Sequence, residues 1–233
     1  MKKKINTVLF AYSFPHRKTL DFIRRLYEEG FLISLILAAN YELIKSPKSA
    51  FEFKQKKLTT SIEKLVTKYS IPLHIVKHNS EESILLLKKY KINFGIISGA
   101  RILKQNIIQS IKYGVLNFHP AVLPYVRGLD SILWSIEKDY PIGVTAHLIN
   151  EQIDAGFLVY QKNTPISNED DIYTLYEKNY QLQLDLIPIS LNLIFKRNLF
   201  PILKMGEYNH KMSYTKQLAL HNKVEEYIKK HSA

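Results

Sequence analysis

The chain has 233 residues, of which 46% are hydrophobic and 23% are charged, a balance that supports a buried core and speaks against disorder. No apolar run approaches the roughly 18 residues that cross a bilayer, and the start of the chain turns polar too soon for a signal peptide, so we expect a cytoplasmic protein. The absence of cysteine excludes disulfides, thiolate catalysis and cysteine-ligated zinc.

The formal net charge of +12 raises the question of nucleic-acid binding, because clustered Lys and Arg gain affinity for phosphate by releasing counterions. The lysines are spread along expected helix faces, as at Lys88 and Lys89, and no RNA- or DNA-binding motif accompanies them. A solvated basic face is therefore favoured, and such a face would also help to capture anionic ligands.

The first half of the chain alternates short β-branched runs with longer segments of helical period, which is typical of βαβ units and a parallel sheet. We expect a doubly wound or flavodoxin-like core. Its strands are expected near Thr7–Tyr12, Leu32–Leu37, Leu73–Val76, Phe94–Ser98 and Val115–Phe118. Its helices are expected at Lys18–Glu29, inside Phe51–Tyr69, at Glu81–Tyr90 after a Ser80 cap, and at Lys104–Ile111.

The character of the sequence changes after Phe118, where a Pro-rich loop begins. The pattern then predicts, in order, a helix at Asp130–Glu137, strands at Ile142–Ile149 and Phe157–Gln161, and a long helix at Glu169–Lys196 kinked by Pro188. The tail from Arg197 is polar and basic, and either an ordered appendage or a partly frayed end is compatible with it. We therefore expect a catalytic domain at 1–196 and a C-terminal extension at 197–233.

Polar residues where a strand ends are the first candidates for a site, because ligands of open α/β sheets bind beyond the carboxyl ends of the strands. Asn117 and His119 are two apart on an extended chain, which aims both at one face, and Pro120 then stops the strand. A neutral imidazole can relay a proton near pH 7 and a carboxamide can donate to an oxyanion. The pair suits acyl transfer, although a strand-end histidine is often only structural.

Further motifs occur in order around this pair: Leu123-Pro124 with Arg127-Gly128, Gly143-Val144-Thr145-x-His147, and Asp154-x-Gly156. With them the chain resembles the folate-dependent formyltransferase family from about Phe94 to Gln161. That family includes glycinamide ribonucleotide transformylases, methionyl-tRNA formyltransferases and sugar N-formyltransferases, and the last group is the most similar. The resemblance implies an α/β fold with a Rossmann-like, mostly parallel sheet flanked by helices and a short C-terminal appendage.

The resemblance assigns the family's catalytic positions to Asn117, His119 and Asp154, with His147 close to the site. Asn117 would donate to the oxyanion, His119 would stabilise it and relay the proton, and Asp154 would orient and charge His119 or an intervening water. A plain turn residue before Gly156 is the alternative for Asp154.

The resemblance also implies 10-formyltetrahydrofolate as co-substrate. Arg101, Ile102 and Leu103 resemble the pterin-binding segment, and the facing loop would contribute Asn150 and Asp154. Alternatively, Ile102 and Leu103 simply cap the core. No metal is implied, because the histidines do not fall at ligand spacing with carboxylates.

Three further residues, Tyr125, Arg127 and Trp134, are expected to bind the acceptor substrate. Arg127 could hold a phosphate or carboxylate bidentately, but an arginine before glycine often braces a loop instead. For Trp134, a place in the core or in a pocket wall is favoured over stacking on a base.

Departures from the family pattern narrow the acceptor. The loop Ala11–Lys18 has no glycine, so the phosphate cradle of glycinamide ribonucleotide enzymes is missing, and the tail from Arg197 is too short for the tRNA-binding barrel. We expect the amine of a nucleotide-linked amino sugar, of the dTDP-4-amino-4,6-dideoxy type, for surface polysaccharide (lipopolysaccharide) synthesis. Glycinamide ribonucleotide formyltransferase, formyltetrahydrofolate hydrolase and a nucleic-acid-binding module remain alternatives, and a homodimer is the default.

Overall fold

The structure, a computed structural model, describes residues 4–42, 48–53, 56–197 and 199–232, and its chain divides into two compact units. Among the described residues, the first unit comprises 4–42, 56–117 and 148–151, and the second comprises 48–53, 118–147, 152–197 and 199–232. Residues 54–55 of the expected helical stretch, and residues 198 and 233 of the expected extension, lie outside the described part.

Parallel strands form the centre of the first unit, in the order β3-β2-β1-β4-β5. The register pairs Val8 with Leu35, and Gly95 with Val115. β1, β2 and β4 are apolar and almost wholly buried, as expected for strands covered by helices on both faces. The strands are β1 (Thr7–Tyr12), β2 (Leu35–Ala39), β3 (Leu73–Ile75), β4 (Phe94–Ile97) and β5 (Val115–His119), the last of which continues into the second unit.

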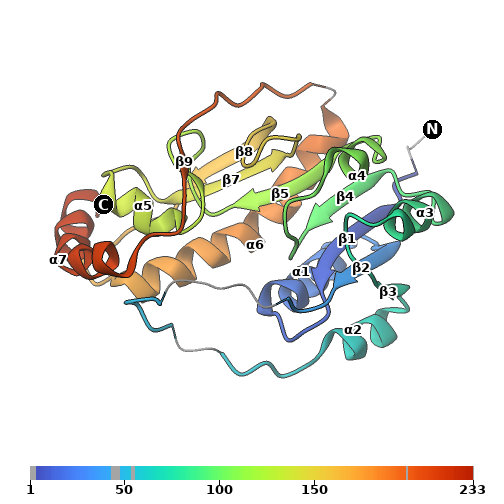
Figure 1. The fold of residues 1–233 in the computed structure, drawn as a ribbon, viewed down its shortest axis with the longest axis horizontal. Coiled ribbons are helices and arrows are strands. Elements are labelled where there is room, and N and C mark those ends of the chain that lie inside the picture. The colour runs from blue at the N-terminus through green and yellow to red at the C-terminus, as the bar shows by residue number, and fades with distance from the viewer. Residues whose placement is uncertain (1–3, 43–47, 54–55, 198, 233) are drawn as a thin grey trace. The chain divides into compact units, whose positions relative to one another are not determined.

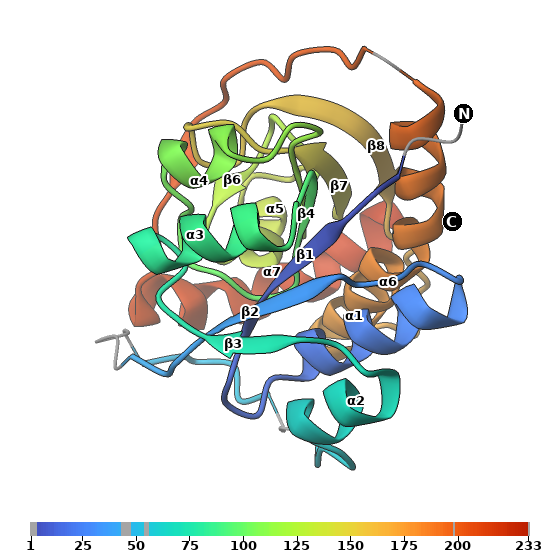
Figure 2. The same cartoon turned by 90° about the vertical axis from the view of Figure 1, so that its right-hand side faces the viewer.

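Helices cover both sides of these strands, and Figure 2 shows α1 and α2 on one side with α3 and α4 on the other. The helices are α1 (Arg17–Glu28), α2 (Ile62–Tyr69), α3 (Glu81–Lys89) and α4 (Gln105–Gln109). Side chains at three of the N-caps accept backbone N–H groups, and the expected cap Ser80 accepts from Ser83 at 3.2 Å. The connections reverse direction between β1 and β4, and such a switch point is where α/β sheets bind ligands.

The second unit contains two neighbouring strands, a short parallel ribbon and three helices. Its elements are β6 (Arg127–Gly128), α5 (Ser131–Glu137), β7 (Gly143–Leu148), β8 (Phe157–Asn163), α6 (Ile172–Lys196), β9 (Tyr208–Asn209) and α7 (Tyr214–His231). Apolar side chains from α5, α6 and α7, among them Leu133, Leu175 and Leu220, share one core. From the end of α6 the chain runs to β9, which pairs with β6, and then into α7 beside α5 (Figure 1).

The expected fold class is confirmed: a mostly parallel sheet flanked by helices. The second strand begins at Leu35 instead of Leu32, because Gly30 ends α1 with φ 71° and Leu32 is left 69% exposed. Pro188 lies inside α6 without ending it. The expected tail is ordered where the structure describes it and ends in α7. Separately, no described helix is long and apolar enough to span a bilayer.

Candidate active site

The carboxyl end of β5 carries Asn117 and His119, as the sequence predicts, with Phe118 buried between them. Asn117 is the half-buried last residue of this stretch of the first unit. His119 belongs to the second unit and is only 4% exposed. The structure places Asp154, also in the second unit, against the His119 ring.

Both ring nitrogens of His119 face oxygen atoms. Nδ1 lies 3.2 Å from Asp154 Oδ1, and Nε2 lies 2.9 Å from the carbonyl oxygen of Val126, with Ser131 Oγ at 3.4 Å. Because a carbonyl oxygen can only accept, Nε2 must carry a hydrogen. If Nδ1 carried no hydrogen, its lone pair would face the oxygen of the carboxylate and the two acceptors would repel each other. The contact becomes a hydrogen bond when a second proton lies between Nδ1 and Oδ1. His119 and Asp154 are thus built to hold a proton between them.

Asp154 is held in a defined geometry. Its Oδ2 accepts the N–H of Gly128 at 2.8 Å, and its backbone has the left-handed φ of 47°, a conformation that costs a non-glycine residue on the order of 1 kcal/mol. Burial raises the pKa of its carboxyl group, but the charge and hydrogen bond of His119 and the N–H of Gly128 more than offset this and hold the pKa below its usual value. Asp154 is therefore ionised near neutral pH.

The second buried histidine, His147, is kept neutral. Burial, and secondarily the charge of His119, lower its pKa to about 4. Its Nδ1 lies 2.8 Å from the carbonyl oxygen of Ala155, to which the neutral ring donates. His147 therefore braces the turn that carries Asp154 and does not exchange protons near neutral pH.

The three residues expected to bind the acceptor have different surroundings. Arg127 is 5% exposed and its guanidinium donates to the carbonyl oxygens of Ile153 and Gly206, an arrangement that agrees with the loop-bracing alternative. Trp134 packs on the core of the second unit and donates Nε1–H to the His210 carbonyl at 2.8 Å. Tyr125 is half exposed and stacks on Tyr140, with ring centroids 5.1 Å apart. Tyr125 alone of the three has a largely accessible side chain.

The expected pterin-binding segment is a braced loop of the first unit. The carboxamide of Asn79 donates to the Ile102 carbonyl at 2.9 Å and accepts the N–H of Lys104 at 2.7 Å. Ile102 is 61% exposed, whereas Leu103 is buried as a core cap. The side chain of Arg101 forms a half-exposed ion pair with Glu42 at 3.1 Å. Asn150, the remaining predicted member, is half-buried.

Sequence reasoning missed Asn79. The only signal was its place in the short loop between β3 and the Ser80 cap of α3, where a carboxamide can hydrogen-bond a neighbouring backbone. Asn79 holds the loop 101–104 at two backbone positions, Ile102 and Lys104.

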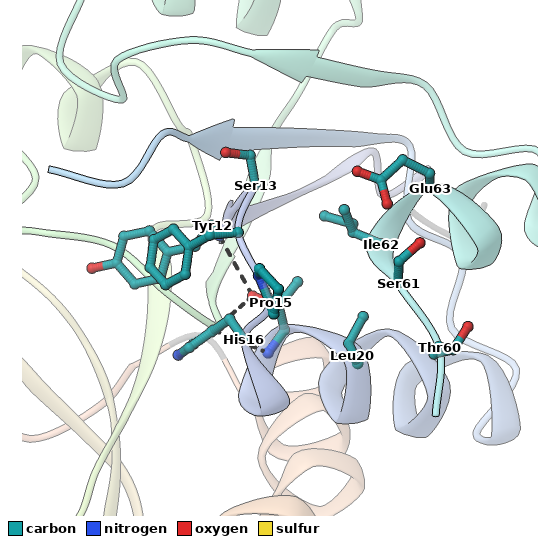
Figure 3. Close-up of a pocket in the computed structure, with 11 residues that line it drawn as sticks. Tyr12, Ser13, Pro15, His16, Leu20, Thr60, Ser61, Ile62 and Glu63 are labelled. Carbon is teal, nitrogen blue, oxygen red and sulfur yellow. Dashed lines mark hydrogen bonds between the residues drawn. The ribbon is translucent and has the colours of Figure 1, made fainter. Parts of the chain in front are cut away.

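A pocket of about 200 Å³ opens beside the loop after β1, between that loop and the start of α2 (Figure 3). Tyr12 and Phe14 stack there with centroids 4.7 Å apart, and a Cβ on Gly99 would lie 2.6 Å from Tyr12, so the loops after β1 and β4 pack closely. Burial, and then the charge of Lys18, lower the pKa of His16 to about 4, and its Nδ1 accepts the N–H of Thr19. None of the predicted site residues lines this pocket.

Within the described residues, no group of three His, Asp or Glu side chains is arranged to hold a metal ion.

Comparison with known proteins identifies the family. The sequence profile of the formyl transferase family matches residues 35–190. Methionyl-tRNA formyltransferase of Thermodesulfovibrio yellowstonii is 31% identical over 152 residues, which cover 64% of this chain and 49% of that protein. The chain thus spans about half the length of the curated relatives it matches.

Solved structures share the fold at lower identity. The formyltransferase PseJ from Anoxybacillus kamchatkensis, determined with UDP-4,6-dideoxy-4-formamido-L-AltNAc and tetrahydrofolate, has a TM-score of 0.61 and 21% identity, over 96% of this chain and 97% of that one. Phosphoribosylglycinamide formyltransferase from Bacillus halodurans has a TM-score of 0.63 and 21% identity, over 84% of this chain and 99% of that one. With a profile match over two thirds of its length, the chain belongs to the formyl transferase family.

Proposed function

We propose that this protein transfers a formyl group from 10-formyltetrahydrofolate to the amine of a nucleotide-linked amino sugar, of the dTDP-4-amino-4,6-dideoxy type, for surface polysaccharide synthesis. The observation that carries the proposal is the His119–Asp154 pair beyond β5, in a chain of the formyl transferase family. We expect the enzyme to work in the cytoplasm, as a homodimer.

The roles of the three catalytic residues follow from their chemistry. In formyl transfer the amine nitrogen bonds to the formyl carbon, the bond from that carbon to the folate nitrogen breaks, and one proton passes from the amine to that nitrogen. Asn117 donates to the formyl oxygen as negative charge develops there. His119 adds the charge of its imidazolium and relays the proton through Nδ1, because Nε2 is committed to Val126. Asp154, whose Oδ1 faces Nδ1, orients the ring and balances its charge while the proton is in transit.

The loop 101–104 is the proposed place of the flat pterin ring. The bracing by Asn79 fixes the backbone in advance, which lowers the entropy cost of binding, and the exposed Ile102 side chain offers an apolar contact. We propose that Arg101, Ile102 and Leu103 hold the pterin, together with Asn150 and the backbone of Asp154. The bound folate would supply the formyl group.

The extent of the structural likenesses supports an amino-sugar acceptor. The likeness to PseJ covers 96% of this chain and therefore extends past residue 190, into the region that forms β9 and α7. The likeness to the Bacillus halodurans enzyme uses 99% of that protein and leaves about a sixth of this chain without a counterpart. The loop after β1, with Tyr12 and Phe14 in place of glycines, also lacks a phosphate cradle.

Methionyl-tRNA is the second candidate acceptor. Several curated relatives named methionyl-tRNA formyltransferase match this chain, and the net charge of +12 suits a polyanion. Binding to tRNA would weaken steeply with added salt, whereas binding of a nucleotide sugar would weaken far less.

One assay separates these acceptors. The enzyme would be incubated with 10-formyltetrahydrofolate and, in turn, dTDP- and UDP-linked 4-amino-4,6-dideoxy sugars, glycinamide ribonucleotide, methionyl-tRNA, or water alone, while tetrahydrofolate release is followed. We expect turnover with an amino sugar only. Release in water alone would identify a hydrolase, and turnover with either of the other acceptors would replace the sugar.

The variant His119→Asn tests the chemistry of the site. It should lose transfer by about 10³-fold or more, because oxyanion charge and proton relay are removed together. Folate affinity should change little, because His119 lies outside the proposed pterin loop. A variant that keeps normal turnover would contradict the mechanism.

A further inference from the structure

The second unit ties its C-terminal region to the His119–Asp154 pair. Residues 199–213, which we call the C-terminal strap, leave the end of α6, contribute β9 and lead into α7 (Figure 1). β9 pairs in parallel with β6, so that Arg127 lies opposite Tyr208 and Gly128 lies opposite Asn209. β6 itself contains Gly128, whose N–H binds Asp154. It directly follows Val126, whose carbonyl oxygen binds His119.

Arg127 joins the strap to the residue before Asp154. Its Nη1 donates to the Gly206 carbonyl at 2.7 Å, while Nε, at 3.1 Å, and Nη2 both donate to the Ile153 carbonyl. The planar guanidinium fork can satisfy both carbonyls at once, which a single ammonium group cannot do in the same geometry. Arg127 is 5% exposed, and these bonds account for all three guanidinium nitrogens.

Asn209 holds the backbone of the same segment. Its carboxamide nitrogen donates to the Arg127 carbonyl at 3.1 Å, and its own carbonyl accepts the N–H of Leu129 at 2.9 Å. Between these two bonds lies Gly128, whose N–H is the donor to Asp154 Oδ2. The strap therefore fixes the position of that donor.

The strap can lie this close only because two positions, Gly206 and Gly128, carry no side chain. A Cβ on Gly206 would lie 1.8 Å from the carbonyl oxygen of Pro124, and one on Gly128 would lie 2.2 Å from the carbonyl oxygen of Asn209. Both contacts are to backbone atoms, which cannot swing aside as a side chain can. Glycine at these two positions therefore lets the strap lie against the backbone on both sides of Arg127.

Asp154 is consequently fixed at three points: by the carbonyl that precedes it, by the N–H of Gly128 and by His119. The first two points depend on Arg127 and the strap. We propose that Arg127 is a positioning residue, not an acceptor ligand, and that through Gly206 and Asn209 the C-terminal strap sets the geometry of the His119–Asp154 pair. The kinetic consequence of this inference rests on the proposed formyl transfer. The geometry that it describes is the same whichever acceptor is used.

The test compares Arg127→Lys and Asn209→Ala with Lys204→Met, an exposed strap residue, as the matched control. Each full-length variant would be assayed for kcat and KM with 10-formyltetrahydrofolate and the active acceptor. Arg127→Lys and Asn209→Ala should lower kcat by about 10- to 100-fold and leave both KM values within about twofold, because a misplaced pair weakens the transition state and not substrate binding. Lys204→Met should match the wild type.

A second readout is the ¹⁵N chemical shift of the His119 imidazole nitrogens, followed against pH in histidine-labelled protein. The positioning role predicts that both variants change the titration of Nδ1. A role limited to folding stability would lower the melting temperature but leave the Nδ1 titration unchanged. A rise in KM at constant kcat, or an unaltered Nδ1 titration in both variants, would overturn the proposal. If the wild type transfers formyl to none of the acceptors, the proposed function fails, and the Nδ1 titration alone decides the positioning role.

Discussion

His119 and His147 are both buried, but their neighbours give them different chemistry. The ring of His119 faces the Asp154 carboxylate with one nitrogen and the Val126 carbonyl with the other, and the carbonyl fixes the position of one hydrogen. The ring of His147 donates to a carbonyl and is otherwise buried, so its pKa falls to about 4. Our proposal therefore assigns proton transfer to His119 and a structural role to His147.

Asp154→Asn tests this division. The carboxamide oxygen can still accept from Gly128, but it cannot hold a proton on His119, so kcat should fall by about 10² to 10³-fold with little change in melting temperature. Steady-state kinetics and thermal melts would be measured on the same preparation. A protein that melts far below the wild type would instead support Asp154 as a structural turn residue.

Asn79→Ala tests the braced loop of the first unit. Losing the bonds to Ile102 and Lys104 should raise the Kd for folate by about 5- to 30-fold, because each hydrogen bond contributes about 1 kcal/mol to holding the binding conformation. Asn79→Asp keeps the acceptor for Lys104 and should show a smaller rise. Equal affinity in all three proteins, measured by titration calorimetry, would remove the loop from the folate site.

At the scale of elements, short polar side chains cap the starts of α2, α3, α6 and α7. α6 begins with a capping box, in which the carboxylate of Asp171 accepts the N–H of Thr174 and the hydroxyl of Thr174 accepts the N–H of Asp171, both at 2.7 Å. This start lies next to Ile172 and Leu175, which are part of the core of the second unit. The cap therefore fixes where the longest helix meets that core.

Asp171→Ala should destabilise the protein by about 1 kcal/mol and lower the melting temperature by about 2 to 4 °C, because the N–H of Thr174 loses the carboxylate that accepts it. Glu169→Ala, an exposed neighbour, is the matched control and should melt with the wild type. Differential scanning calorimetry on both would decide, and equal melting of the two variants would show that the cap contributes nothing measurable.

At the scale of the whole molecule, buried neutral histidines in both units link stability to pH. Burial lowers the pKa of His16 and of His147 to about 4 and also lowers that of His78. In the unfolded chain these groups titrate near 6.5, so the unfolded state takes up protons first as the pH falls. Their contribution to stability is fully present above pH 6.5 and is lost toward pH 4.

The free energy of unfolding should therefore fall between pH 7.5 and 4.5 by an amount on the order of 3 kcal/mol for His147 alone. Urea titrations at the two pH values would measure it. His147→Gln, which keeps a donor for Ala155, should lose that share of the pH dependence. An unchanged dependence in this variant would mean that His147 does not remain neutral in the folded state.

Much of the fold was predictable because its information is local. Alternating runs located β1 and β5 within a residue, and Ser80 marked the start of α3. The ribbon of β6 and β9 was not predicted, because two-residue strands have no period. The helix α7 was also missed, although Leu220 and Val224 lie at helical spacing on its buried face, since its many lysines made the tail read as polar.

The positions of the candidate site residues were predictable to the extent that motifs mark them, and their roles stay predictions. Strand-end chemistry drew attention to Asn117 and His119, and the resemblance supplied Asp154. The supports Asn79 and Asn209 were out of reach, because each acts on backbone that is 23 or more residues away in the chain. Such contacts exist only once the chain has folded.

The hydrogen bonds through which Arg127 and the C-terminal strap hold Asp154 also affect the order in which parts of the chain can fold during synthesis. Arg127 and Gly206 are 79 residues apart, and Arg127 and Asn209 are 82 apart. A nascent chain therefore exposes His119, Arg127 and Asp154 long before the residues that hold them have been made, and closing so long a loop is a late and slow event. The loop 101–104 and its Asn79 brace can therefore form before Gly206 and Asn209 have been synthesised, whereas the His119–Asp154 pair reaches its final geometry only after them.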